Sequence, residues 1–408
     1  MTDTLHSPAS LPTADDLRAE VKTWLAQKWT RPQAAPAQAG TRWPEAGIPD
    51  TAWLDKVLEA GYLVPTWPAA WYGRAYPNEL AAVIEQEFAA AGAPGACQDK
   101  HNIAANTALK FGTQKLQNDL IRDLLTGRAV PCLFYSEPGA GSDLAGVRTT
   151  AVKDGDHWVV NGQKVWTSGA AKADYALMIA RTDWDAPKHR GLSYFVVPMR
   201  QTGIEVRPLV QITGESHFNE VFITDAIVPG EYLVGEAGNG WRVLQTALAY
   251  ERSIMGDGAR ASRHGSLADD LIGLARKHGC LDDPVVRHRL ARVLALRELN
   301  ALNNARAKAD AEQGTSSSVM SLGKLAMANI LHAEAGLRTE IIGAHSLLAG
   351  DENPEADDVN FLALNAFFTS IGGGTNQIQR NIIGERVLGL PKEPEVDRNI
   401  PFRQVRRS

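Results

Sequence analysis

The sequence predicts an α+β protein in which a helical segment, a β module and a helical bundle follow one another along the chain. Apolar residues recur at helical spacing to about residue 130, strand-like runs follow to about residue 240, and long helical patterns then return. No helical pattern separates the strand-like runs, which argues against βαβ units and a doubly wound sheet. We therefore expect three domains, at residues 1–130, 131–240 and 241–408.

The first segment is expected to be mainly helical. Leu17, Val21 and Leu25 recur at four-residue spacing behind acidic residues, and residues 79–92 form a second helical pattern. A proline-rich interruption at residues 31–49 separates the two patterns.

The middle segment is expected to be an antiparallel sandwich or barrel. Its runs are rich in β-branched and aromatic residues, and turn clusters such as DGD, APKHRG and QTG separate them. The runs cover residues 157–166, 175–182, 192–199, 204–210 and 219–228.

The third segment is expected to form a four-helix bundle. Its helical patterns cover residues 238–255, 266–279, 284–314 and 321–345. An acidic, proline-containing stretch at residues 350–360 is expected to be a surface loop, and the basic tail at Arg403, Arg406 and Arg407 a solvated terminus.

Composition excludes several classes of protein. The 42 Lys and Arg against 47 Asp and Glu give a net charge of −5, which offers no footprint for a nucleic acid. Three dispersed cysteines build neither a disulfide framework nor a zinc site, and no histidine pattern suggests a metal. Without a secretory signal or a membrane-length apolar run, the chain is expected to be cytoplasmic.

The glycine loop, residues 136–143, has the sequence SEPGAGSD and lies where the helical texture changes to β. Gly139 and Gly141 would let the backbone approach a bulky ligand. Spacing alone is equally compatible with a tight connecting loop, because the pattern is not G-x-G-x-x-G.

Three collinear motifs closely resemble those of the acyl-CoA dehydrogenase family. They are FYSEPGAGSD, the strand pair ending in VNGQKVWTSGA, and GGGTNQIQRNIIGERVLGLP at residues 372–391. The resemblance implies that family's fold, with FAD as cofactor, an acyl-CoA substrate, electron-transfer flavoprotein as acceptor and a tetrameric assembly. Without its flanking motif, Trp166 would be interpreted as a core aromatic on a strand.

The resemblance assigns cofactor contacts to residues of all three motifs. They are Tyr135, Ser136, Gly141, Ser142, Trp166, Thr167, Ser168, Thr375 and Gln377. Ser142, Arg252 and Gly373 are assigned to the substrate. Thr375 also has the position of a helix N-cap.

The base that abstracts the substrate's α-proton is missing from its usual place. Most members carry a glutamate in the loop that here reads GGGT, so that Gly373 occupies its position. On a helical wheel, Glu251 lies about 20° from Leu244, beside an apolar stripe that includes Leu248. A minority branch of the family places its glutamate on this helix, before an arginine, as Glu251 and Arg252 stand here. The alternative is a structural ion pair between Glu251 and an arginine.

The half-site that a neighbouring subunit normally supplies for the FAD diphosphate looks incomplete. Residues 275–290 lack the family's Arg-x-Phe-Gly stretch, and Glu340 and Ser346 replace a glutamine and a glycine. A carboxylate facing a diphosphate would repel it. We therefore hypothesise an α2β2 assembly with a paralogous subunit, as in bacterial steroid-type acyl-CoA dehydrogenases.

Two other functions remain open from the sequence. The same flavin platform could serve an oxidase or another reaction, and the chain could be a non-catalytic subunit of a heteromeric dehydrogenase.

Overall fold

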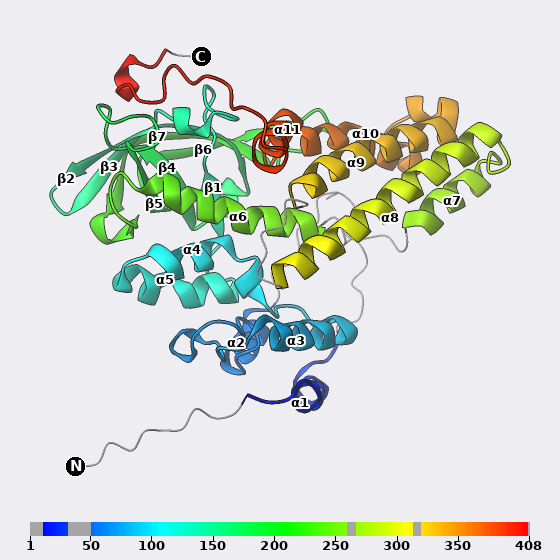
Figure 1. Cartoon of the computed structure of the whole chain (residues 1–408), viewed down its shortest axis with the longest axis horizontal. Helices are drawn as coiled ribbons and strands as arrows, with labels where there is room; N and C mark the ends of the chain where they lie inside the picture. The colour runs from blue at the N-terminus through cyan, green and yellow to red at the C-terminus, as the bar shows by residue number, and fades with distance from the viewer. Residues whose placement is uncertain (1–10, 32–49, 259–266, 313–319, 407–408) are drawn as a thin grey trace.

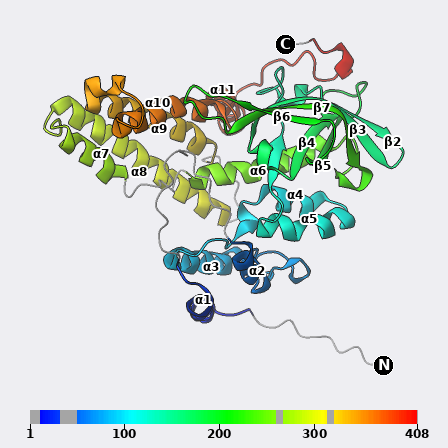
Figure 2. The same cartoon turned by 180° about the vertical axis from the view of Figure 1, so that it is seen from behind.

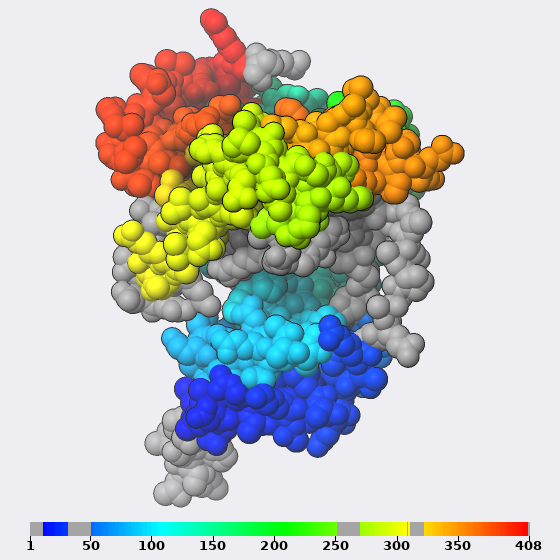
Figure 3. Space-filling model, turned by 90° about the vertical axis from the view of Figure 1, so that its right-hand side faces the viewer, coloured from blue at the N-terminus to red at the C-terminus, as the bar shows by residue number. Residues whose placement is uncertain are grey.

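Three parts of the chain stack side by side in the computed structural model (Figure 1). The structure describes residues 11–31, 50–258, 267–312 and 320–406, and leaves the side chains of residues 251–269, 308 and 311–321 undescribed. The N-terminal helices lie at one end, with the sheet and the C-terminal helices next to each other at the other (Figures 1 and 2). Seen from the side of the bundle, the blue-to-cyan N-terminal helices are at the opposite end from the green-to-orange bundle helices (Figure 3). The predicted order of helices, sheet and helices is confirmed.

The N-terminal helices pack through the apolar stripes that the sequence indicates. Helix α1 begins after Thr13, whose hydroxyl accepts a hydrogen bond from the N–H of Asp16 at 3.2 Å, and it buries Leu17, Val21 and Leu25. The helices of this part are α1 (Ala14–Lys28), α2 (Thr51–Glu59), α3 (Asn78–Ala91), α4 (Ile103–Phe111) and α5 (Gln114–Thr126), with the short 3₁₀ turn η2 at Gln98–Lys100. From residue 32 onward, the predicted proline-rich interruption lies outside the described residues.

One sheet of eight strands forms the middle of the described chain, in the order β6-β7-β3-β2-β4-β5-β8, with β1 paired to β4. The strands are β1 (Pro131–Phe134), β2 (Thr150–Asp154), β3 (His157–Ser168), β4 (Tyr175–Arg181), β5 (Leu192–Pro198), β6 (Ile204–Leu209), β7 (Phe218–Pro229) and β8 (Leu233–Val234).

The prediction of a purely antiparallel module is wrong in one respect. Strand β1 pairs with β4 in parallel, and β2 meets β4 in parallel at Thr150 and Arg181. Parallel neighbours need a long connection that returns the chain to the same end. Here the glycine loop and the β2–β3 hairpin lie between β1 and β4 and make that return.

The C-terminal part is a helical bundle joined to the sheet by α6. Helices α7 to α10 pack on one another, and α6 contacts α9 of the bundle as well as α4, β4 and β5. The helices are α6 (Gly240–Gly258), α7 (Leu267–Lys277), α8 (Pro284–Glu312), α9 (Met320–Ile342), α10 (Pro354–Ile371) and α11 (Asn376–Ile382). No helix of the described chain is long and apolar enough to cross a membrane.

One expectation for this part is wrong. The predicted surface loop at residues 350–360 contains the start of α10, because Pro354 stands at the first helical position and Glu355 and Asp357 favour the helix N-terminus. In the basic tail, Arg403 and Arg406 are exposed as predicted, and Arg407 lies outside the described residues. Phe402 beside them is 1% exposed.

Candidate active site

The glycine loop leaves β1 and is fixed by backbone hydrogen bonds. Glu137 and Ala140 exchange two N–H···O bonds of 3.0 Å, and the carbonyl of Ser136 accepts one from Val165 on β3. A Cβ atom built on Gly139 or Gly141 would meet no atom within 4 Å. The protein's own packing therefore does not require glycine there, and the loop borders open space.

A buried ion pair between Lys164 and Glu137 stabilises the glycine loop. The Nζ atom of Lys164, a residue with no exposed surface, donates to Oε1 of Glu137 at 2.9 Å. The other acceptors of Lys164 are the carbonyls of Tyr135 (3.1 Å) and Ile179 (2.9 Å). Burial alone would raise the pKa of Glu137. The charge of Lys164, together with hydrogen bonds that include the N–H groups of Arg148 (2.6 Å) and Thr149 (2.9 Å), holds that pKa below its usual range.

Trp166 leaves the sheet at a β-bulge between Lys164 and Thr167. Its φ of 60° is in the left-handed region, which costs a non-glycine residue roughly 1–2 kcal/mol. The residue is 62% exposed, and its ring meets Phe218 edge-on with centroids 6.0 Å apart. A strained backbone that presents an indole to open space is typical of a ligand platform.

The two residues after Trp166 present hydroxyl groups of different kinds. Thr167 is 1% exposed, and within the described structure its Oγ1 has no hydrogen-bond partner. Ser168 is exposed, and Gly169 turns the chain with a φ of 69°.

The GGGT loop, residues 372–375, lies beside this platform through a row of aromatic rings. Phe218 contacts both Trp166 and, with centroids 5.4 Å apart, Phe368 of α10. Gly372 sits against Phe368, because a Cβ there would be 2.6 Å from the ring. The structure thus brings together residues that are about 200 positions apart in the sequence.

Thr375 caps α11 as predicted, with its hydroxyl accepting from the N–H of Ile378 at 3.2 Å. Gly373 and Gly374 have φ angles of 64° and 88°. A side chain at Gly373 would be strained, in keeping with the absence of a glutamate there. The side chain of Gln377 is exposed.

Other predicted site residues have different surroundings. Tyr135 is 8% exposed in the core between the sheet and the N-terminal helices, and its hydroxyl lies 2.6 Å from that of Tyr194. Ser136 is half-buried, and Gly141 and Ser142 are exposed. The backbone of α6 continues through Glu251 and Arg252, whose side chains lie outside the described residues.

Three basic groups near the expected diphosphate half-site pair with carboxylates of this chain. Lys277 and His278 both contact Glu355, and Arg289 contacts Glu340. The hydroxyl of Ser346 donates to the carbonyl of Gly343 at 2.7 Å.

Sequence reasoning missed Lys164 and the two phenylalanines. A signal for Lys164 exists, because Trp158, Val160 and Lys164 recur at even spacing on the buried face of β3. Nothing in the local sequence pairs Phe218 with Phe368, since that contact depends on how the bundle meets the sheet.

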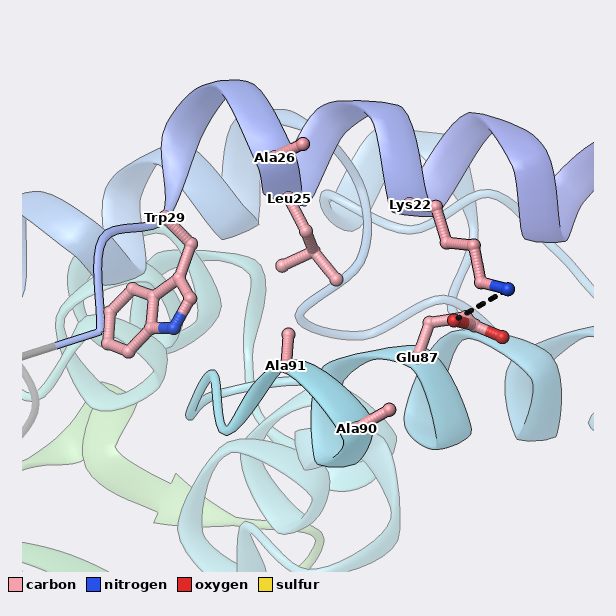
Figure 4. Close-up of a pocket in the computed structure, with 7 residues that line it drawn as sticks. All are labelled: Lys22, Leu25, Ala26, Trp29, Glu87, Ala90 and Ala91. Atoms are coloured by element: carbon pink, nitrogen blue, oxygen red, sulfur yellow. Dashed lines mark ion pairs between the residues drawn. The ribbon is translucent and has the colours of Figure 1, made fainter.

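A hollow of about 330 Å³ lies elsewhere, between α1 and α3 (Figure 4). Its lining is mostly apolar, with Lys22 and Glu87 forming an ion pair of 3.8 Å at one side. None of the predicted site residues lines it.

Comparison with known proteins matches the chain along most of its length. The N-terminal, middle and C-terminal domains of acyl-CoA dehydrogenase match residues 12–128, 132–226 and 238–388. The acyl-CoA dehydrogenase IpdE1 of Mycobacterium tuberculosis is 38% identical over 387 residues, which cover 93% of this chain and 98% of that protein.

Two solved structures share the fold over nearly all of their length. The Tcur3481-Tcur3483 steroid ACAD is 28% identical, with a TM-score of 0.74, and the match covers 93% of this chain and 98% of that one. The ChsE4-ChsE5 complex from Mycobacterium tuberculosis is 29% identical, with a TM-score of 0.66, over 95% of this chain and all of that one. The chain therefore belongs to the acyl-CoA dehydrogenase family of flavoprotein oxidoreductases.

Proposed function

We propose that this protein is an FAD-dependent dehydrogenase that desaturates the α,β-bond of an acyl-CoA thioester. The observation that carries the proposal is the exposed Trp166 on its strained bulge, beside a GGGT loop that lacks the usual base. Together these features support a flavin platform and favour a proton-abstracting group from another element.

The residues around Trp166 fit an isoalloxazine ring. An exposed indole can pack against a planar ring. The exposed hydroxyls of Ser142 and Ser168 offer polar contacts to its edge, whereas the unpartnered Oγ1 of Thr167 is buried beneath the surface. FAD, when bound, supplies the acceptor for the hydride from the substrate's β-carbon.

Glu251 is proposed as the base that takes the α-proton. It follows the buried Leu244 by seven positions, a spacing that places both residues on one side of a helix. Backbone N–H groups of the GGGT loop are suited to hydrogen-bond the thioester carbonyl as negative charge develops there. Arg252 would orient the carboxylate or the loop.

A bulky, steroid-like acyl group is the substrate class that the relatives favour, since the solved neighbour is a steroid ACAD. Gly372 does not leave room for such a group. The space beside Gly372 is filled by the ring of Phe368.

Replacing Trp166 with glycine is expected to weaken flavin binding while leaving the free energy of unfolding nearly unchanged. Relief of the left-handed strain offsets the backbone entropy of glycine, so the free energy of unfolding should change by less than about 1 kcal/mol. Loss of the indole should weaken FAD binding at least about tenfold. Titration of apoprotein with FAD measures this, with the exposed Val152→Ala on β2 as control; unchanged FAD affinity would contradict the role of Trp166.

We also propose that a paralogous subunit completes the FAD site in an α2β2 tetramer. The ion pairs of Lys277, His278 and Arg289 within the chain support this, because they occupy cations that a diphosphate would need. Phe367 and Ile371, one turn apart on α10, are 62% and 64% exposed and offer an apolar surface to a partner. Electron-transfer flavoprotein is the proposed electron acceptor.

Expression of the chain alone and with a paralogous subunit tests the proposal. Co-expression should give a heterotetramer that retains FAD and reduces an artificial acceptor with an acyl-CoA, while the lone chain should retain little FAD. A lone homotetramer with one FAD per subunit would contradict the heteromeric assembly. Oxygen consumption in place of acceptor reduction would identify an oxidase.

A further inference from the structure

The C-terminal strap, residues 391–406, crosses the sheet after α11 and ends beside the loop between β4 and β5 (Figure 1). Pro401 and Pro187 form an isolated antiparallel bridge. The N–H of Phe402 donates to the carbonyl of Ala186, and the N–H of Arg403 donates to that of Trp184, each at 3.0 Å. The strap is therefore bound to that loop by its backbone.

Phe402 anchors the strap in a cationic and aromatic pocket. The guanidinium of Arg181, a residue with no exposed surface, lies 3.6 Å from the centroid of the Phe402 ring, and that of Arg148 lies 4.9 Å from it. Burial and the neighbouring Arg148 lower the pKa of Arg181 to about 10. An aromatic face stabilises such a buried cation, so Phe402 and Arg181 hold each other in place.

Lys188 connects this anchored strap to the glycine loop. Its side chain is 13% exposed, and its Nζ lies 3.0 Å from Oδ2 of Asp143 and 3.3 Å from Oδ2 of Asp397. Asp143 directly follows Ser142, and Asp397 belongs to the strap. One largely buried ammonium group thus ties the ligand-facing loop to the strap.

The loop between β4 and β5, which carries Lys188, also contacts the first turn of α6. The rings of His189 and Trp241 meet edge-on with centroids 4.8 Å apart. In addition, Leu192 and Asn239 form a parallel bridge just before the helix. Lys188 therefore stands where the glycine loop, the strap and the helix of Glu251 come together.

We propose that Lys188 is a positioning residue, which together with the strap sets the conformation of the glycine loop for cofactor and substrate. This inference rests on the proposed function, which makes that loop the ligand contact. Without the ammonium group, Asp143 and Asp397 would lose the cation that lies between them, and their like charges would repel each other. The loop would then lose its tie to the strap.

Hydrogen exchange of the purified protein, with its flavin and any co-purifying subunit, tests the tie directly. Lys188→Met should speed amide exchange in peptides covering residues 136–147 by about tenfold, because local opening becomes easier. Lys153→Met, at an exposed lysine of β2, is the control and should leave the exchange unchanged. Asp397→Asn should act in the same direction but more weakly, and its effect should not add to that of Lys188→Met, since the contact it removes is one of the two that Lys188→Met removes. Exchange in Lys188→Met equal to the control would overturn the inference.

Kinetics then separate positioning from catalysis. Lys188→Met should raise the KM for an acyl-CoA about fivefold while kcat stays within about twofold, and Lys188→Arg should restore most of the loss. Faster amide exchange in Lys188→Met with unchanged KM and flavin content would contradict the proposal that Lys188 and the strap position the ligands. Failure of the proposed function would show differently, as a wild-type protein whose flavin no acyl-CoA reduces, whatever the exchange rates.

Discussion

Glu251→Gln is expected to retain FAD and acyl-CoA binding but to lower turnover by about 10²–10⁴. Glutamine keeps the size and polarity of the side chain, yet its amide cannot accept the α-proton at neutral pH. The GGGT loop offers no replacement, because Gly373 has no side chain and a φ of 64° that disfavours one. Anaerobic reduction of the flavin by an acyl-CoA measures the effect without involving the electron acceptor.

The matched control is Glu298→Gln, which makes the same chemical change at an exposed position of α8. Its turnover should stay within about twofold of the wild type, as expected for a surface substitution. Near wild-type flavin reduction by Glu251→Gln would refute the assignment of the base. If flavin content fell as well, the structural alternative, an ion pair of Glu251 with an arginine, would be the better account.

Lys164→Met is expected to destabilise the fold by about 3–5 kcal/mol at neutral pH, the usual cost of leaving one partner of a buried ion pair. The glycine loop should lose its support at the same time, because Lys164 also holds the carbonyl of Tyr135. Urea unfolding measures the loss, with the exposed Lys153→Met as control. A double variant with Glu137→Gln should recover part of the stability, since it removes the orphaned charge.

In Lys164→Met, the contribution of Glu137 to the pH dependence of the free energy of unfolding should have the opposite sign from its contribution in the wild type. In the wild type the folded-state pKa of Glu137 is lowered, so its contribution is present above the unfolded pKa and is lost as the pH falls through the folded value. In Lys164→Met the buried carboxyl loses its ion-pair partner, so burial is expected to raise its folded pKa above the unfolded one, and acidification relieves the destabilisation. The difference in the free energy of unfolding between the wild type and Lys164→Met should therefore decrease from pH 7 toward about pH 4, near the ordinary pKa of glutamate. A constant gap would show that Glu137 and Lys164 are not coupled.

Much of the fold could be predicted because the local patterns and the packing agree. The four-residue spacing of Leu17, Val21 and Leu25 is the buried face of α1, and Thr375 caps α11. The parallel pairing of β1 with β4 could not be predicted, because strand direction depends on the path of the chain between them. The acidic stretch at residues 350–360 is predicted as a loop but contains the start of α10 at Pro354. Its sequence does not separate the two, because proline is common both in loops and in the first turns of helices.

The site was predictable only where its residues lie in one motif. Trp166 and the glycines belong to local sequences with a recognisable pattern, whereas the contact of Phe218 with Phe368 joins β7 to α10 across 150 residues. The tie between Asp143, Lys188 and Asp397 likewise joins three distant segments by charge. Such contacts follow from tertiary packing, which single-segment patterns do not contain.

The position of Phe402 in the sequence also determines when, during synthesis, the strap can bind to the rest of the protein. A ribosome delivers the glycine loop first, then Lys188, and Asp397 and Phe402 only after all other contributors. Translation at about 5–20 residues per second puts more than ten seconds between the first and the last of these. Throughout that interval the nascent loop has neither the strap nor its phenylalanine anchor, so the contacts that hold the loop to the strap form only after residues 397–402 have been synthesised.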